Sequence, residues 1–296
     1  MRPLLSIVIA SYNARATIAR ALASLAAQHT DLPFETIVVD SGADDTAALV
    51  ARDFPAVRLI RSAERRFAGE ARNLGVAEAS GDVFAFLDAD CVVGPEWVEA
   101  VMRAHAAPHP VIGGVVENGN PSSLAGWAYY FTEFNRWLPS MAAGFVDEVP
   151  GCSMTVKRAA YERYGPFLIG AYCSDTQFIW RCRADGVRPY LDPTIRVGHL
   201  NPTRIGAILR HEPRHGRDFA RLRGREQLGR VGAFARAVLS PLLPPLLFLR
   251  AARQARGHFG RFLLVSPLTA AGITAWSFGE ARGYLECAFG GVEPTR

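Results

Sequence analysis

Two aspartates two residues apart offer the clearest chemistry in this chain of 296 residues. Asp88 and Asp90 directly follow Val83–Leu87, a short apolar run typical of a buried strand. Paired carboxylates are hard oxygen ligands that suit Mg²⁺ or Mn²⁺ and can share the ion with phosphate oxygens of a substrate. The alternative is a solvated turn in which aspartate caps a helix. The position after a strand favours a metal site that neutralises a diphosphate leaving group.

Two further strand-like runs also end in polar side chains. Leu4–Ala10 is followed by Ser11, Tyr12 and Asn13, and Phe34–Asp40 ends at its own aspartate. Ligands of open parallel sheets bind outside the carboxyl ends of the strands. We therefore expect these groups and Asp88 to meet at one edge of a sheet.

The elements that would position these groups alternate between strand and helix at intervals of about 25 residues, which is typical of βαβ units. The fold class predicted is α/β, with a central, mostly parallel, twisted sheet. The predicted strands are Leu4–Ala10, Phe34–Asp40, Val57–Arg61, Val83–Leu87, Val111–Val116 and Arg188–Val197, and the predicted helices are Ala14–Ala27, Asp44–Asp53, Glu70–Ala79, Glu96–Ala106, Ala159–Tyr164 and Asp175–Ala184. The stretch Gly151–Lys157 is expected to be extended.

The chain resembles the inverting family 2 glycosyltransferases of GT-A fold, of the bacterial membrane-associated type. The resemblance covers roughly residues 4–200. Its matching segments are Ser6–Asn13 (SIVIASYN), Glu35–Ala43 (ETIVVDSGA), Gly69–Gly75 (GEARNLG), Phe86–Asp90 (FLDAD), Gly151–Arg158 (GCSMTVKR) and Asp175–Gly186 (DTQFIWRCRADG). It implies a catalytic domain at 1–202, with a nucleotide-binding half at about 1–95 and an acceptor half at about 96–202, and a separate C-terminal region at 203–296.

The resemblance also implies an activity and its partners. The expected reaction transfers a sugar from a nucleotide-sugar donor, most commonly a UDP-sugar, to an acceptor hydroxyl with inversion. Mn²⁺ or Mg²⁺ would serve as cofactor. The acceptor is unknown and includes lipid-linked compounds, in keeping with synthesis of a cell-envelope glycan or glycolipid.

The same resemblance gives roles to individual residues. The nucleotide-sugar-binding set is Ser11, Tyr12, Asn13, Asp40, Arg72, Asp88 and Ala89. Asp90 would bind the metal directly, and His199 would complete the metal sphere. For Arg72 the alternative is a solvated helix face, and a lone histidine is more often structural.

Asp175 is the candidate general base. Inversion requires one in-line attack by a hydroxyl that loses its proton, so a carboxylate within hydrogen-bond reach is needed. The alternative is that Asp175 caps the start of a helix. Many family members have glutamate directly before this aspartate, whereas Ser174 stands here.

The C-terminal third is strongly basic. Between Thr203 and Arg261 there are thirteen arginines and three acidic residues, a balance of +10. Such a region favours an anionic partner, and beside apolar segments that partner is a membrane surface. It has few aromatic residues, so no nucleic-acid platform is expected. His211 and His215 are interpreted as part of this basic face rather than as metal ligands.

Two apolar segments accompany the arginines. Phe262–Phe278 has 17 uncharged residues, and as a helix it would span about 25 Å, short of the roughly 30 Å hydrocarbon core. Val231–Leu249 contains three prolines. We predict an interfacial or re-entrant hairpin on the cytoplasmic side of the cell membrane; the alternatives are a buried helical hairpin and two true spans. The lack of a cleavable signal pattern and of paired cysteine motifs fits a cytosolic catalytic part with reduced thiols.

Three other functions were weighed. A sugar nucleotidyltransferase would need a Gly-rich loop with Arg and Lys after the first strand, where Ser11-Tyr12-Asn13 stands instead. A Rossmann oxidoreductase would need G-x-G-x-x-G at the same turn, and the chain lacks it there. A catalytically degenerate membrane scaffold would not require the acidic residues, and Asp40, Asp88, Asp90 and Asp175 are all present.

Overall fold

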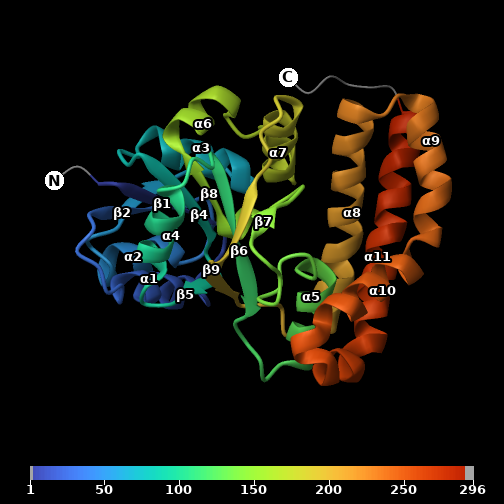
Figure 1. Ribbon diagram of the computed structural model, residues 1–296, viewed down its shortest axis with the longest axis horizontal. Coiled ribbons are helices and arrows are strands. Elements are labelled where there is room, and N and C mark those ends of the chain that lie inside the picture. Colours follow the sequence, from blue (N-terminus) through green and yellow to red (C-terminus); the bar gives the residue numbers. More distant parts are fainter. Residues whose placement is uncertain (1–2, 291–296) are drawn as a thin grey trace. The chain divides into compact units, whose positions relative to one another are not determined.

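The computed structural model describes residues 3–290, which divide into two compact units (Figure 1). The first unit contains the described residues up to Gly119 together with Trp137–Gly170 and Ser174–Leu200. The second contains Asn120–Arg136, Ala171–Cys173 and the described residues from Asn201 onward. The segment Asn120–Arg136 therefore belongs to the second unit, and the domain bounds implied by the resemblance stay a prediction.

A nine-stranded sheet forms the centre of the first unit, in the order β3-β2-β1-β4-β8-β6-β9-β5, with β7 paired to β9. The strands are β1 (Leu5–Ser11), β2 (Phe34–Asp40), β3 (Arg58–Arg61), β4 (Val83–Asp88), β5 (Cys91–Val93), β6 (Val111–Asn118), β7 (Gly144–Phe145), β8 (Met154–Lys157) and β9 (Tyr190–His199). Strands β3, β2, β1 and β4 run parallel to one another, and β6 runs parallel to β9. Strands β8, β5 and β7 pair antiparallel.

The helices of the first unit connect these strands. They are α1 (Ile18–Ala26), α2 (Thr46–Asp53), α3 (Ala68–Ala77), α4 (Trp97–His105), α6 (Arg158–Tyr164) and α7 (Ser174–Ala184), with a 3-10 turn η1 at Gly151–Ser153. Each predicted strand and helix has a counterpart here, and the α/β fold class with its central sheet is confirmed. Strands β5 and β7 were not predicted, because two or three residues are too few to show a hydrophobic period.

The central strands are buried because they carry apolar side chains on both faces. In β1, Ile7, Val8 and Ile9 are fully buried, and Ile37–Val39 of β2 are too. Beside them, aromatic rings from β4 pack on rings from the α6–α7 region; the centroids of Phe86 and Phe167 lie 5.1 Å apart, edge to face. A rigid sheet of this kind holds the residues at its carboxyl edge in fixed positions.

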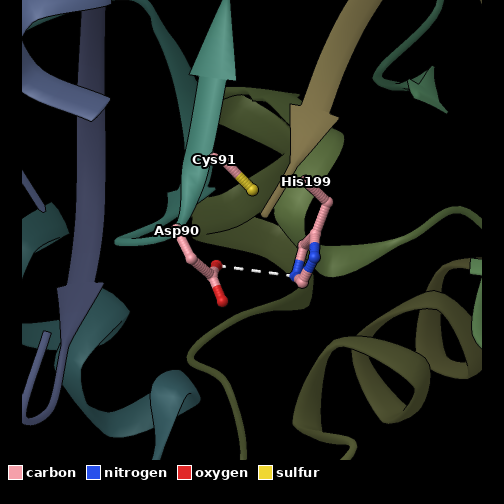
Figure 2. Close-up of side chains that lie close together, drawn as sticks. All are labelled: Asp90, Cys91 and His199. Carbon is pink, nitrogen blue, oxygen red and sulfur yellow. Dashed lines mark ion pairs between the residues drawn. The ribbon is translucent and has the colours of Figure 1, made fainter. Parts of the chain in front are cut away.

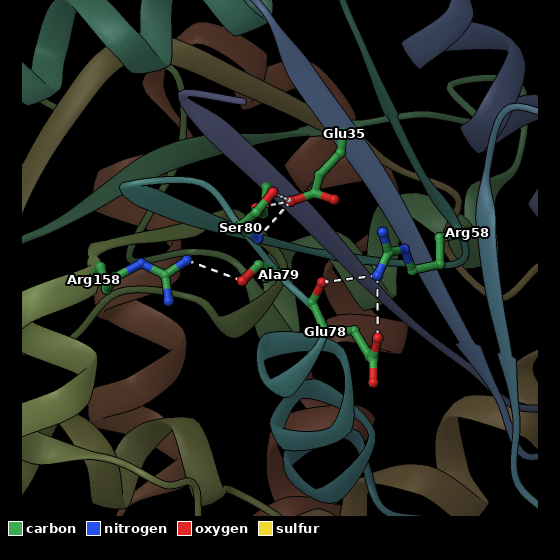
Figure 3. A network of polar contacts seen from close by, with 7 residues as sticks. Glu35, Arg58, Glu78, Ala79, Ser80 and Arg158 are labelled. Atoms are coloured by element: carbon green, nitrogen blue, oxygen red, sulfur yellow. Dashed lines mark hydrogen bonds and ion pairs between the residues drawn. The ribbon is translucent and has the colours of Figure 1, made fainter. Parts of the chain in front are cut away.

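A polar network anchors α3 at the opposite edge of the sheet, near the amino ends of β1 and β2 (Figure 3). One Glu35 carboxylate oxygen accepts hydrogen bonds from the hydroxyls of Ser6 and Ser80, each at 2.7 Å. Partial burial acts to raise the pKa of Glu35, but these hydrogen bonds outweigh it and lower the pKa. Arg158 donates to the carbonyl oxygens of Ala79 and Gly81. The network therefore fixes the end of α3, the helix that carries Arg72.

The second unit is helical. Its helices are α5 (Leu124–Glu133), α8 (Ile205–Gln227), α9 (Arg230–Leu239), α10 (Pro244–Gln254) and α11 (Phe259–Phe289), with short 3-10 turns η2 (Ser240–Leu242) and η3 (Ala255–His258). Helix α11 packs against α8, α9, α10 and α5. Glycines allow the close approach of α8 and α11: a Cβ on Gly279 would lie 2.1 Å from the Pro213 carbonyl oxygen.

The apolar C-terminal segments are helical, as expected. The prolines of Val231–Leu249 fall where α9 gives way to η2 and α10. Within the described residues, the helical stretch Pro244–Phe289 is long and apolar enough to cross a membrane by length and composition alone, and 39% of its most apolar window is buried inside the protein. The interfacial hairpin stays a prediction.

Candidate active site

Polar side chains converge at the carboxyl ends of β1, β2 and β4, as the sequence predicted. Ser11 lies opposite Asp40 in the β1–β2 register, and Ala10 lies opposite Asp88 in the β1–β4 register. The Ser11 hydroxyl donates a 2.7 Å hydrogen bond to the Asp40 carboxylate, and both side chains are buried. Three neighbouring strands thus place their terminal polar residues at one edge.

The loop after β1 combines a structural residue with an exposed ring. Asn13 has a φ of 51°, a conformation that asparagine tolerates better than most residues. Its side-chain oxygen accepts a 2.9 Å hydrogen bond from the Ala43 amide, which ties this loop to the one after β2. The Tyr12 ring is 45% exposed, and the Arg65 guanidinium lies over it, 4.6 Å from the ring centroid. Arg65 carried no signal in the sequence.

Arg72 lies between two of the predicted site carboxylates. Its side chain is only 4% exposed, and a guanidinium nitrogen donates to the Asp88 carboxylate at 2.8 Å. Burial acts to lower the pKa of Arg72, but the charges of Asp88 and Asp175 outweigh it and raise the pKa. The guanidinium is therefore a fixed positive charge shared by the last residue of β4 and the first turn of α7.

Asp175 lies in the first turn of α7, where one carboxylate oxygen accepts a 2.9 Å hydrogen bond from the Thr176 amide. The other oxygen lies against Gly151: a Cβ there would be 2.2 Å from it and 2.9 Å from a guanidinium nitrogen of Arg72. Gly151 therefore leaves the space in which Asp175 and Arg72 meet. The sequence placed Gly151 in a matching segment without giving it a role.

Asp90 and His199 point toward one another from the start of β5 and the end of β9 (Figure 2). The His199 Nε2 lies 3.5 Å from an Asp90 carboxylate oxygen. The antiparallel pairing of β5 with β9 sets Cys91 opposite His199, and the Leu200 amide donates to the Asp90 carbonyl at 2.8 Å. A strand of three residues thus brings together two groups that are far apart in the chain.

The electrostatics around Asp90 fit a cation. Desolvation and the nearby charge of Asp88 raise the pKa of the Asp90 carboxyl, although His199 acts in the opposite direction. A carboxylate and an imidazole that point toward one another form a donor pair that could hold a divalent ion. Asp90 and His199 are thus the residues that could hold it.

Cys91 is the third potential ligand near this point. Its thiol lies within 4.8 Å of the ligand atoms of Asp90 and His199. Full burial raises the pKa of the Cys91 thiol well above its usual range, and Cys152 and the nearby aspartates act in the same direction. Sulfur is a soft ligand, whereas Mg²⁺ and Mn²⁺ favour oxygen donors, so Cys91 suits such an ion less well than Asp90 does. The chain's five cysteines are all free thiols.

The predicted residues thus lie in two connected groups. Ser11, Asp40 and Asp88 share the carboxyl edge, and Arg72 joins Asp88 to Asp175. Asp90 and His199 form the second group, which adjoins the first through the buried Ala89. The structure adds Arg65 and Gly151 to the residues that sequence reasoning had named. The individual roles of all these residues remain predictions.

Comparisons with known proteins agree with this architecture. Residues 6–164, more than half of the chain, match the sequence model of Glycosyl transferase family 2. The chain is 26% identical over 251 residues to Glycosyltransferase AglE from Haloferax volcanii, covering 82% of each protein. It is 41% identical over 113 residues to validoxylamine A glucosyltransferase from Streptomyces hygroscopicus. That match covers 36% of this chain and only 27% of the relative's length.

Solved structures show the same fold. The mannosyltransferase PcManGT from Pyrobaculum calidifontis, solved in complex with GDP-Man and Mn²⁺, has a TM-score of 0.60 at 20% identity, covering 97% of this chain and 86% of that one. GalNAc-T7, solved with UDP, GalNAc and Mn²⁺, has a TM-score of 0.54 at 16% identity, covering 67% and 44%. With a family match over more than half of its length and this sheet, the chain belongs to glycosyl transferase family 2 and has the GT-A fold.

Proposed function

We propose that this glycosyltransferase transfers a sugar from a nucleotide-sugar to an acceptor hydroxyl in a single, metal-dependent, inverting step at a membrane surface. The observation that carries the proposal is that Arg72 links the carboxylate on the donor side of the site to the carboxylate on the acceptor side. This residue contacts Asp88, which precedes the cation site in the chain, and lies beside Asp175, the proposed base for the acceptor.

The donor pocket is proposed to lie over the carboxyl ends of β1, β2 and β4. Ser11 and Asp40 form its floor, since their hydrogen bond orients a buried carboxylate toward a ribose or base. Tyr12, covered by Arg65, offers a ring face for the nucleobase. Asn13 shapes the loop, and Asp88 faces the ribose side. A UDP-sugar is the first candidate donor, and GDP- and dTDP-sugars are the alternatives.

Asp90 and His199 are the proposed ligands of Mn²⁺ or Mg²⁺. The bound ion would supply positive charge opposite the diphosphate that leaves the sugar. Asp90 would contribute a carboxylate oxygen and His199 an imidazole nitrogen, and the backbone hydrogen bond from Leu200 to Asp90 fixes the position of Asp90 beside the end of β9. Ala89 is buried, so the two aspartates project from a fixed turn.

Asp175 is proposed to accept the proton of the attacking hydroxyl. The Thr176 amide and the Arg72 guanidinium orient its carboxylate, which leaves it ready to accept a hydrogen bond from an acceptor. Direct in-line attack requires no covalent intermediate, so one correctly placed carboxylate is sufficient. Positioning of this type supplies much of the catalytic effect.

The second unit is proposed to associate with the cytoplasmic face of a membrane. Large apolar side chains are exposed on α9 to α11, among them Val231, Leu242 and Leu246 at 83%, 67% and 64%. A shallow hollow of the same unit is lined by Leu249, Ala252, Arg253, Arg256 and Phe259. Apolar surface bordered by arginine suits the interface of an anionic leaflet. An acceptor attached to a lipid would be delivered at the same surface.

The reaction class can be tested with purified full-length protein in mild detergent, supplied with UDP-, GDP- and dTDP-sugars and Mn²⁺ or Mg²⁺. We expect nucleoside diphosphate release from one donor only when metal is present. Asp90→Asn is expected to lower the rate about 100-fold or more, because it removes the charged ligand. The exposed Asp45→Asn serves as the control and is expected to keep wild-type activity.

The stereochemistry of transferred or hydrolysed sugar, followed by proton NMR from the first minutes, tests inversion. Retention of configuration would contradict a single displacement. The same protein can be given metal and a total lipid extract as the source of acceptor. If it then binds nucleotide but neither releases nucleoside diphosphate nor transfers sugar, the degenerate scaffold is favoured over an enzyme.

The proposed base is tested by Asp175→Asn, for which we expect kcat to fall about 10²- to 10⁴-fold while nucleotide affinity is retained. Gly151→Ala is also expected to reduce kcat, because the new Cβ would occupy the space of the Asp175 carboxylate. Gly94→Ala is the matched control, since a Cβ there meets nothing within 4 Å. Initial rates and nucleotide titrations measure both quantities. A kcat within about twofold of wild type for Asp175→Asn would contradict the assignment.

Membrane association is tested by flotation with vesicles of anionic or neutral lipid. Each arginine near an anionic surface contributes about 1 kcal/mol, so Arg253→Gln with Arg256→Gln is expected to reduce binding to anionic vesicles by roughly 10- to 30-fold. The control carries Arg52→Gln and Arg163→Gln, two exposed arginines of the first unit, and should bind as wild type. Equal binding to neutral and anionic vesicles would exclude an electrostatic contribution, and lack of binding to either would refute membrane association.

A further inference from the structure

A second group of metal-ligand side chains lies wholly within the helical unit. Glu133 is the last residue of α5, and His211 and His215 lie on α8. Their ligand atoms all fall within 4.8 Å of one another. From the sequence, both histidines are interpreted as part of a basic face rather than as metal ligands; in the structure they meet a carboxylate from another helix.

The spacing of the two histidines favours joint coordination. Residues His211 to His215 read His-Glu-Pro-Arg-His, which has the spacing H-E-x-x-H. On a helix, residues four apart lie on the same face, and this arrangement places two imidazoles where one Zn²⁺ ion can bind both. Pro213 lies inside α8 without ending the helix.

The distances suit a small tetrahedral ion. The Glu133 carboxylate oxygen lies 2.9 Å from His215 Nδ1 and 3.7 Å from His211 Nε2. Ligand bonds of about 2.0–2.1 Å in a tetrahedron set neighbouring donor atoms about 3.3–3.4 Å apart, between these two values. Only small rotations of the side chains would be needed.

A further buried group points to a ligand at this place. Glu212 is fully buried, and its carboxyl group lies beside that of Glu133. Two neighbouring buried carboxyl groups are costly unless something compensates their charge and hydrogen-bonding capacity. The thiol of Cys173 also lies next to His215. Glu212 and Cys173 are therefore candidates for a fourth ligand, directly or through water.

Aromatic rings enclose the group. The Tyr172 ring centroid lies 5.2 Å from that of His215, and the Tyr129 hydroxyl lies 3.4 Å from His211 Nε2. Trp276 of α11 approaches His215 from another side, with ring centroids 6.4 Å apart. Ring contacts of this kind help to fix the orientation of the two imidazoles, as surroundings of metal sites do.

We propose that Glu133, His211 and His215 bind a Zn²⁺ ion that joins α5 to α8. Two imidazoles with one carboxylate favour zinc over the harder Mg²⁺ and Mn²⁺ assigned to Asp90. The ion would replace an ion pair between Glu133 and His215 as the contact between the two helices. None of these three residues is assigned a role in sugar transfer, so the proposal does not depend on the enzymatic activity of the chain.

The test uses the full-length protein in mild detergent, stripped with a chelator and then supplied with Zn²⁺ alone. We expect one zinc per chain after gel filtration, measured by elemental mass spectrometry. Co²⁺ in place of zinc should give the visible absorption of a tetrahedral centre. Glu133→Gln and His215→Gln are each expected to lower zinc affinity at least about 10- to 100-fold.

Two controls separate this site from the other metal site and from general effects on folding. Asp90→Asn and His258→Gln, the latter a histidine of the same unit outside the cluster, should retain zinc as the wild type does. Circular dichroism and elution volume verify that each variant is folded. Wild-type protein that takes up no stoichiometric zinc would overturn the proposal, as would zinc lost in Asp90→Asn but kept in Glu133→Gln and His215→Gln.

Discussion

The site of the first unit depends on the buried ion pair of Arg72. The Arg72 side chain is only 4% exposed. Its buried charge is compensated by Asp88, which binds the guanidinium at 2.8 Å, and by Asp175, which lies close by. Leaving such a charge unpaired costs several kcal/mol, so α3, β4 and the start of α7 must keep their relative positions. The Arg72 guanidinium therefore orients one carboxylate on the donor side, Asp88, and one on the acceptor side, Asp175. The fixed end of α3 and the space left by Gly151 both serve this contact.

The cation site depends on a different constraint, the pairing of β5 with β9. This short antiparallel contact places His199 at the turn that carries Asp90, beside the parallel strands that deliver Ser11, Asp40 and Asp88. The parallel part of the sheet thus presents the polar residues, and the antiparallel β5–β9 pair adds the imidazole of His199. Neither half alone brings together the ligands that a divalent ion requires.

Much of the first unit could be predicted because its strands are apolar runs and their polar ends identify the binding edge. Asp88 and Asp90 could be found in this way, whereas β5 is too short for its pattern to reveal why His199 lies near them. Local sequence could suggest that Arg72 is functional, but not that its side chain is buried between two carboxylates. It could not reveal the environment of His211 either, because Glu133 approaches from a helix far away in the chain. Contacts of this kind arise from tertiary packing between distant segments, and no hydrophobic repeat in the local sequence reveals them.

The central claim is that Asp90 and His199 hold a divalent cation next to a nucleoside diphosphate bound over the ends of β1, β2 and β4. Crystals of the full-length protein grown with UDP and Mn²⁺, with diffraction recorded at the manganese absorption edge, test it most directly. We expect one anomalous peak between the Asp90 carboxylate and the His199 ring, next to the bound diphosphate. Bound UDP without manganese at that point, or manganese bound by other residues of this unit, would contradict it.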